Sequence, residues 1–268
     1  MSNSYLLKKF NYSNGILNNS VDATYIIYLE GNNDRYNNII NQLNNISPTD
    51  TIYILFNKGW KNGKKRDYVT NSAIDLIDAN ITCFNHANKK NYNNILVLED
   101  DFVFDDKLKD LNVIKNIDNF ILNKKDTSFS FYLGTIPFIF YPYNLYINKS
   151  IFNIYTHSII FSKKYRNNVL NYNYKNLICW DLFQIYFNFN KYYYNIPLIY
   201  QTIEETENSN NWLVPKFVRK AWLYLSKITK CDKDPRLFFK IMYLLSYIFF
   251  IFIISLIIYI FIKFIKIY

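Results

Sequence analysis

The sequence predicts an α/β protein in which a mostly parallel sheet with flanking helices is followed by one C-terminal transmembrane helix. Three observations lead to this prediction. Short apolar runs alternate with helical patterns in the first half of the chain, and a long uncharged segment lies near its end. Half of the residues are hydrophobic and a fifth are aromatic, so a disordered chain is excluded. Strands that alternate with helices favour a parallel sheet.

Three short β-branched and aromatic runs in the first half each predict a strand. They are Thr24–Leu29, Thr51–Phe56 and Ile95–Leu98. Helical patterns separate these runs, one beginning at Asp34 after a Gly-Asn-Asn turn and a longer one over about Val69–Asn91. In an open sheet of this kind, ligands bind beyond the carboxyl ends of the strands.

The second half is more aromatic and less regular. Ser128–Leu133 and Ser158–Phe161 are predicted strands, and the Pro- and Tyr-rich stretch between them is predicted to be a long loop. Loops of that length are often functional. A helix from about Lys163, another over Asp181–Phe189 and a strand near Ile199 are expected to complete the domain.

The net charge of +10 is concentrated at the C-terminal end. Residues 216–268 contain ten Lys and Arg against two Asp, whereas residues 1–215 contain 21 basic and 19 acidic side chains. A nucleic-acid-binding protein usually carries its basic surface on the folded domain, so nucleic acid is not an expected partner. The basic excess instead flanks an apolar segment, as expected at an anionic membrane surface.

The apolar segment Ile241–Ile262 has 22 residues without a charge, and as a helix it would span about 33 Å, enough to cross a bilayer. The alternative, a buried core helix, would need a large protein around it. Residues 216–240 form a basic juxtamembrane segment and residues 263–268 a short tail. Helical spacing over Phe217–Ile228 indicates an interfacial helix or, alternatively, a surface helix packed on its own domain. Because the basic flank lies before the span, the domain is expected to face the cytosol as a single-pass, tail-anchored protein.

The folded domain is expected over residues 21–215, after an N-terminal extension of residues 1–20. This extension has no apolar run after its lysines and is not expected to be a signal peptide. Cys83, Cys179 and Cys231 are widely separated and have no metal-ligand spacing. A reduced domain on the cytosolic side is consistent with this cysteine usage.

Three consecutive acids, Glu99-Asp100-Asp101, follow the strand Ile95–Leu98 directly. Their mutual repulsion is unfavourable unless a positive group compensates it, and a divalent cation would do so. Mg²⁺ and Mn²⁺ bind through one or two carboxylates and take further ligands from phosphate and water. The alternative is a solvated acidic turn in which Asp100 or Asp101 caps the next segment. Spacing alone leaves both readings open.

Five segments that include these acids follow one another in an order typical of a known family. They are TYIIYLEGNNDRYNNIINQL (Thr24–Leu43), NILVLEDDFVF (Asn94–Phe104), THSIIFSKKY (Thr156–Tyr165), WDLF (Trp180–Phe183) and IPLIYQT (Ile196–Thr202). Together they resemble glycosyltransferase family 25, which includes lipooligosaccharide and collagen galactosyltransferases. Over Ile81–Tyr92 the chain lacks the Gly and Ser of the bacterial members, which leaves the donor sugar open.

The resemblance implies a GT-A fold, a nucleotide-sugar donor, and Mn²⁺ or Mg²⁺ near the donor diphosphate. It implies roles for seven residues: Asp100, Asp101 and His157 at the metal, Leu29, Arg35 and Glu99 near the nucleotide, and Asp181 as the catalytic base. Besides the acids, two of them have structural alternatives: Arg35 as an exposed cation at a helix start, and His157 as a hydrogen-bonded residue before a strand. Glu204, Glu205 and Glu207 are second candidates for the base.

The expected reaction is transfer of a hexose, such as galactose, to a hydroxyl of a glycan, protein or lipid acceptor, with inversion at the sugar. The alternative from another class is a glycosyltransferase-like, membrane-anchored module without turnover that serves a structural or recruiting role. A nucleotidyltransferase is the third reading. It would usually need a Gly-rich phosphate loop, and five scattered glycines do not make one.

Overall fold

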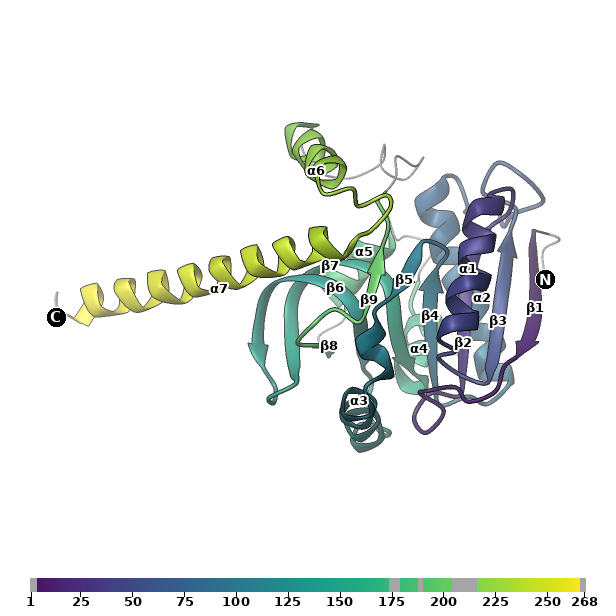
Figure 1. Ribbon diagram of the computed structural model, residues 1–268, viewed down its shortest axis with the longest axis horizontal. Coiled ribbons are helices and arrows are strands. Elements are labelled where there is room, and N and C mark those ends of the chain that lie inside the picture. The colour runs from purple at the N-terminus through teal and green to yellow at the C-terminus, as the bar shows by residue number, and fades with distance from the viewer. Residues whose placement is uncertain (1–3, 174–178, 188–189, 204–215, 266–268) are drawn as a thin grey trace.

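The structure, a computed structural model, describes residues 4–173, 179–187, 190–203 and 216–265 (Figure 1). Its centre is a seven-stranded sheet in the order β1-β3-β2-β4-β7-β6-β8. The strands of this sheet are β1 (Tyr5–Asn11), β2 (Ala23–Leu29), β3 (Thr51–Asn57), β4 (Asn94–Glu99), β6 (Ser130–Pro142), β7 (Ile147–Ser162) and β8 (Lys191–Tyr194). β5 (Phe102–Phe104) and β9 (Ile199–Gln201) pair antiparallel in a separate two-stranded sheet.

Most strands of the main sheet run in one direction. β2 pairs in parallel with both β3 and β4, and β6 pairs in parallel with β8. β7 runs antiparallel to both β4 and β6, so β6 has the same direction as β4. Among the described strands of this sheet, only β1 and β7 run against the others. The predicted α/β class with a mostly parallel sheet is therefore confirmed.

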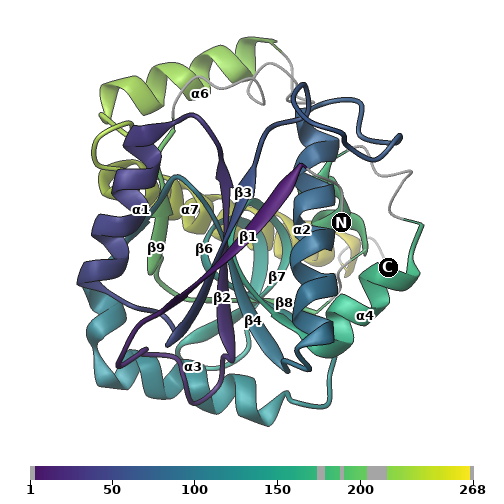
Figure 2. The same ribbon diagram turned by 90° about the vertical axis from the view of Figure 1, so that its right-hand side faces the viewer.

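Helices cover both faces of the sheet (Figure 2). The helices are α1 (Asn33–Asn45), α2 (Ser72–Lys89), α3 (Leu111–Asn123), α4 (Lys163–Asn171), α5 (Trp180–Phe187), α6 (Lys216–Ile228) and α7 (Arg236–Ile265), with one 3-10 turn at Asp106–Lys109. Ile26 and Tyr28 of β2 pack in a core cluster with α1 and α3, whereas Tyr25 and Ile27 pack with α2, α4 and α5. Side chains of a strand point alternately to its two faces, so burial on both faces explains the continuous apolar runs.

The turn from β2 into α1 places a cation at the edge of the sheet. Gly31 has a φ of 101°, which a residue with a Cβ rarely adopts. The side chain of Asn32 then caps α1 by accepting a hydrogen bond from the backbone N–H of Arg35. As a result, Arg35 lies in the first turn of α1, beside the carboxyl end of β2.

The folded domain begins before residue 21, the start predicted from the sequence. β1 lies within residues 1–20, which were predicted to be an extension, and it pairs along its whole length with β3. The strand has no clear apolar pattern in the sequence, because it contains polar residues such as Lys8 and Lys9. An edge strand tolerates them, since backbone hydrogen bonds to its neighbour stabilise it more than burial does.

The prediction of a long loop between Ser128–Leu133 and Ser158–Phe161 is wrong. These residues extend β6 and β7 into a bent antiparallel hairpin in which Phe140 pairs with Ser150. Several register shifts interrupt the pairing, one of them directly after Pro137. Such irregularities bend a strand and accommodate a proline, and they also remove the two-residue alternation by which a strand is recognised.

The C-terminal helices join the domain before α7 leaves it. Trp222, Leu223 and Leu225 of α6 pack on a third core cluster that contains Phe238 and Phe239 of α7. The indole N–H of Trp222 also donates a hydrogen bond to the hydroxyl of Tyr155 at 2.9 Å. α6 is therefore a surface helix packed on its own domain, as one of the two predictions for this segment has it.

From Ile251 on, α7 projects from the domain as a single, mostly exposed helix (Figure 1). In the part of the chain that the structure describes, it is the one helix long and apolar enough to cross a membrane, over Arg236–Lys263. The predicted span of Ile241–Ile262 lies within it. The first turns of α7, however, contribute to the core, so residues 216–240 are not a separate juxtamembrane unit.

Candidate functional site

The acidic residues lie at the carboxyl ends of two neighbouring parallel strands. Glu99 is the last residue of β4 and pairs in register with Ile27 of β2. Asp100 and Asp101 follow directly and are almost fully buried. Because β2 and β4 end at the same edge of the sheet, the residues that follow both strands are brought together there.

Asp100 is held by the residues that follow β2. One of its oxygens accepts a hydrogen bond from the backbone N–H of Leu29 at 2.9 Å, and the other pairs with the guanidinium of Arg35 at 2.5 Å. Burial raises the pKa of Asp100, and Arg35 and the Leu29 N–H act against this rise. The side chain of Arg35 is only 16% exposed, so Arg35 is not the exposed helix-start cation of the alternative reading.

Replacing Arg35 is expected to destabilise the protein. Arg35→Met leaves Asp100 buried without its ion pair, and breaking a buried pair in this way typically lowers the free energy of unfolding by about 3 kcal/mol. The matched control is Lys109→Met, because Lys109 forms an exposed pair with Asp106 at 3.0 Å that is expected to contribute little. Denaturant unfolding of both variants in detergent measures the difference. Equal losses in the two variants would contradict the structural role of Arg35.

Asp101 has one engaged and one unengaged carboxylate oxygen. Oδ2 accepts a hydrogen bond from the side-chain amide of Gln201 at 3.0 Å and lies 3.9 Å from the guanidinium of Arg35. Oδ1 is buried and has no hydrogen-bond partner among the described residues. Burial raises the pKa of Asp101 to about 6; Arg35 opposes this rise and Asp100 adds to it. A buried carboxylate oxygen without a partner is unfavourable unless a ligand contacts it.

Asp181 and Glu99 belong to the same electrostatic cluster. Asp181 lies in the first turn of α5, and its Oδ1 accepts a hydrogen bond from the hydroxyl of Thr156 at 2.5 Å. The Asp181 side chain reaches solvent, yet the protein packs around it closely enough that burial raises its pKa, against the effect of Thr156. Burial, followed by repulsion from Asp101, Asp181 and Asp100, holds the pKa of Glu99 well above its ordinary range.

His157 is buried in a different set of contacts. Its Nε2 donates a hydrogen bond to the backbone oxygen of Ile199 at 3.1 Å, and its ring packs edge-on against Tyr155 and Phe239. Burial lowers the pKa of His157 to about 4, so the ring is neutral at physiological pH. A Cβ at Gly134 would overlap both the Ile199 oxygen and this ring. Within the described residues, the contacts of His157 favour its structural alternative.

The acidic side chains of this site could supply one or two ligands to a metal ion. The described residues contain no group of three or more His, Cys, Asp or Glu side chains arranged to hold a metal. A site for Mg²⁺ or Mn²⁺ needs only one or two carboxylates, because substrate phosphate and water supply the other ligands. The unpartnered Oδ1 of Asp101 and the half-buried carboxyl of Glu99 meet that requirement.

Three residues of the site were not singled out in the sequence. Thr156 contacts Asp181, Gln201 contacts Asp101, and Tyr155 has a φ of 71°, a strained value of the kind that gathers at functional sites. Thr156 and Gln201 lie inside two of the five quoted segments, so membership of those segments was the available signal. Trp180, the neighbour of Asp181, is buried in the core. Glu204, Glu205 and Glu207, the second candidates for the base, lie outside the described residues.

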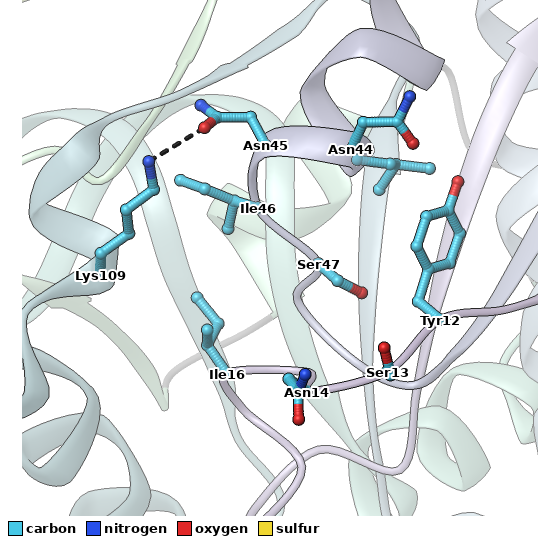
Figure 3. A pocket seen from close by; sticks show the side chains of 10 residues that line it. Tyr12, Ser13, Asn14, Ile16, Asn44, Asn45, Ile46, Ser47 and Lys109 are labelled. Atoms are coloured by element: carbon cyan, nitrogen blue, oxygen red, sulfur yellow. Dashed lines mark hydrogen bonds between the residues drawn. The ribbon is translucent and has the colours of Figure 1, made fainter.

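A cavity of about 390 Å³ lies away from this cluster (Figure 3). It is lined by Tyr12, Asn14 and residues at the end of α1, and the amine of Lys109 donates a hydrogen bond to Asn45 at its rim. α1 begins beside the acidic residues, so its far end lies at the opposite edge of the sheet. None of the described residues that line the cavity is acidic, and the acidic cluster remains the candidate site.

The fold and the site together define an α/β protein with buried carboxylates at the carboxyl edge of its sheet and an apolar C-terminal helix. No protein-family model matches this chain, and no curated protein shows significant similarity to it. Assignment to a function therefore depends on the site itself and on the five segments that form it.

Proposed function

We propose that this protein is a membrane-anchored, metal-dependent glycosyltransferase with a GT-A-like domain, which transfers a hexose from a nucleotide-sugar donor to a hydroxyl acceptor. One observation carries the proposal: all five segments that resemble glycosyltransferase family 25 contribute a residue to the same site. These residues are Leu29 and Arg35, Asp100 and Asp101, Thr156, Asp181, and Gln201. They meet at the carboxyl edge of the sheet, where ligands of such folds bind.

We assign the metal role to Asp101 and Glu99, because Leu29 and Arg35 already engage both oxygens of Asp100. Mn²⁺ or Mg²⁺ bound there would compensate the repulsion among the acids and neutralise negative charge on the departing nucleoside diphosphate. Asp100 then acts by fixing Arg35, whose cationic group lies between the two aspartates and next to the expected diphosphate. His157, bonded to the backbone oxygen of Ile199, receives no metal role.

We assign the base role to Asp181. Its Oδ1 is held by Thr156, which leaves the other oxygen for an acceptor hydroxyl. As the hydroxyl oxygen bonds to the anomeric carbon, its proton passes to Asp181, while the bond to the diphosphate breaks and its electrons leave with the diphosphate. The raised pKa of Asp181 makes it a better base at neutral pH than an ordinary aspartate.

The proposal is tested by screening the full-length protein in detergent for hydrolysis of a panel of nucleotide sugars with Mn²⁺. The full chain is needed because α6 and the first turns of α7 belong to the core. Turnover of one donor, lost in Asp101→Asn, is the expected result. If no donor is hydrolysed or bound in the presence of Mn²⁺, the protein is the non-catalytic membrane module of the alternative reading.

We also propose that α7 is a single-pass tail anchor and that the domain faces the cytosol. Eight basic residues lie between Lys216 and Lys240, against two after the apolar run, and such an excess favours the cytosolic side. Anionic lipid is the expected partner of this basic flank.

Two truncations of α7 are expected to separate anchoring from folding. Removal of Ile251–Tyr268 keeps the buried residues Phe238, Phe239 and Met242 and leaves an apolar run too short to span, so the protein should be extracted by alkaline carbonate with its thermal midpoint little changed. Removal of Ile241–Tyr268 also deletes Met242 and should lower that midpoint clearly. Carbonate resistance undiminished by the loss of Ile251–Tyr268 would overturn the anchor.

A further inference from the structure

α7 remains packed against the domain well into its apolar run. Phe140 of β6 contacts Tyr247 and Phe250 of α7, with ring centroids 5.0 and 4.5 Å apart. Ser246, one residue before Tyr247, is 1% exposed. The end of the hairpin formed by β6 and β7 therefore lies beside α7 as far along the helix as Phe250.

This packing leaves too little free helix to cross a bilayer. From Ile251 to Ile262 there are 12 residues, about 18 Å of helix at 1.5 Å per residue. The hydrocarbon core is about 30 Å thick, so the free part is short by about 12 Å, and any tilt increases the shortfall. A domain held entirely in water is incompatible with a spanning α7 packed in this way.

The charged residues on either side of the apolar run of α7 are separated by the length that a membrane span requires. Lys240 is the last charged residue before the apolar run and Lys263 the first after it, and both are exposed. Their separation of 23 residues corresponds to about 34 Å of helix, which matches a bilayer with the two amines at its surfaces. Phe250 lies between Lys240 and Lys263 along the helix, so Phe250 and the Phe140 ring stacked on it lie between the two bilayer surfaces.

The hairpin that lies at this level has the composition of a lipid-facing surface. It is at the end of the domain from which α7 projects (Figure 1). Residues 135–148 contain no charged side chain. The exposed large apolar residues of the hairpin are Tyr141, Tyr143, Leu145, Tyr146 and Ile151. Tyrosines are enriched where membrane meets water.

Three amines lie near this surface, and all are held by the protein. Lys124, half-buried after α3, places its amine 4.9 Å from the ring centroid of Tyr143. Lys149, half-buried in β7, places its amine 5.8 Å from the ring centroid of Tyr192. Lys191 is 1% exposed and donates a hydrogen bond to the backbone oxygen of Ile151 at 2.9 Å. None of the three amines therefore projects freely from the apolar surface.

We propose that the β6–β7 hairpin is a second membrane contact, immersed in the bilayer beside α7 to a depth on the order of 10 Å. The bilayer covers the exposed tyrosines, Leu145 and Ile151, and α7 and the hairpin enter it as one packed unit. The proposal depends on α7 being a membrane span, and it does not depend on the enzymatic activity.

Spin labels on introduced cysteines test this placement in phosphatidylcholine–phosphatidylserine vesicles that contain the full-length protein. Ile151→Cys reports on the hairpin and Ile257→Cys on α7, and Leu111→Cys, on an exposed residue of α3, is the control in water. Cys179→Ser provides the background, because Cys83 and Cys231 are buried. The measured quantity is the collision rate of each label with oxygen, which concentrates in lipid, relative to that with a water-soluble nickel chelate.

The expected result is a ratio at Ile151 that is close to the ratio at Ile257 and well above that at Leu111. Tyr141→Cys, at a second exposed hairpin position, should give the same result. If Ile257 is in lipid while both hairpin labels are in water, α7 separates from β6 in the membrane and the proposal is overturned, although the anchor stands. If Ile257 is also in water, anchor and hairpin contact both fail.

Discussion

Asp101→Asn is expected to abolish sugar transfer without destabilising the protein. The substitution keeps the shape of the side chain and an oxygen that can accept the hydrogen bond from Gln201, but it removes the negative charge. Loss of charge at the proposed metal ligand would remove the site for the cation that the proposed reaction needs at the departing diphosphate. The variant should therefore show no detectable transfer, and Mn²⁺ with nucleotide, which should raise the thermal midpoint of the parent, should not raise that of the variant.

The stability of the same variant should depend on pH in a defined direction. The pKa of Asp101 rises from 3.8 to about 6 on folding, so the folded protein holds this proton more tightly than the unfolded chain. Ionisation of Asp101 consequently lowers the free energy of unfolding as the pH rises from about 4 to about 6, and the loss persists above that range. In chelator, Asp101→Asn should match the parent near pH 4 and exceed its thermal midpoint at pH 7.5.

The control for both effects is Asp106→Asn, five residues along the chain, where the side chain is 79% exposed. It should change neither transfer nor the pH dependence of the midpoint. If Asp101→Asn keeps its activity but loses much of its stability, the acids form a capped structural turn and the metal assignment is wrong.

Asp181→Asn is expected to reduce transfer by roughly two to four orders of magnitude, the usual effect of removing a positioned base. Asparagine keeps an oxygen for the hydrogen bond from Thr156, so the geometry at the start of α5 should persist. Nucleotide affinity in Mn²⁺ should stay within a few-fold of the parent, because the proposed donor and metal contacts lie on other residues. The metal-site variant, in contrast, should lose that affinity.

Two further measurements separate a base from a structural role for Asp181. In the parent, the acid limb of the kcat/KM profile should lie above the pH of an ordinary aspartate, because the pKa of Asp181 is raised, and this limb should be absent in Asp181→Asn. An acceptor with an acidic hydroxyl should partly rescue the variant. Transfer at the parental rate would make Asp181 structural and direct the search for the base to Glu204, Glu205 and Glu207.

The sequence alone was sufficient for the parts of the fold that depend on local pattern. Three short apolar runs became β2, β3 and β4 within a residue of their predicted ends, and the acids lie at the carboxyl edge of the sheet as expected. The long apolar segment became α7. These features follow from side-chain periodicity and from the uncharged length of a segment, and both can be read from the sequence.

Tertiary structure alone decided which residues share a contact across long separations. The sequence does not show that β1 joins β3, that the Pro- and Tyr-rich stretch pairs as a hairpin, or that Arg35 engages Asp100 and leaves an oxygen of Asp101 unpartnered. It also predicts a membrane span without showing that β6 packs against the first half of it. Pairing between distant strands is selected by the packing of the whole core, whereas local propensity only permits it.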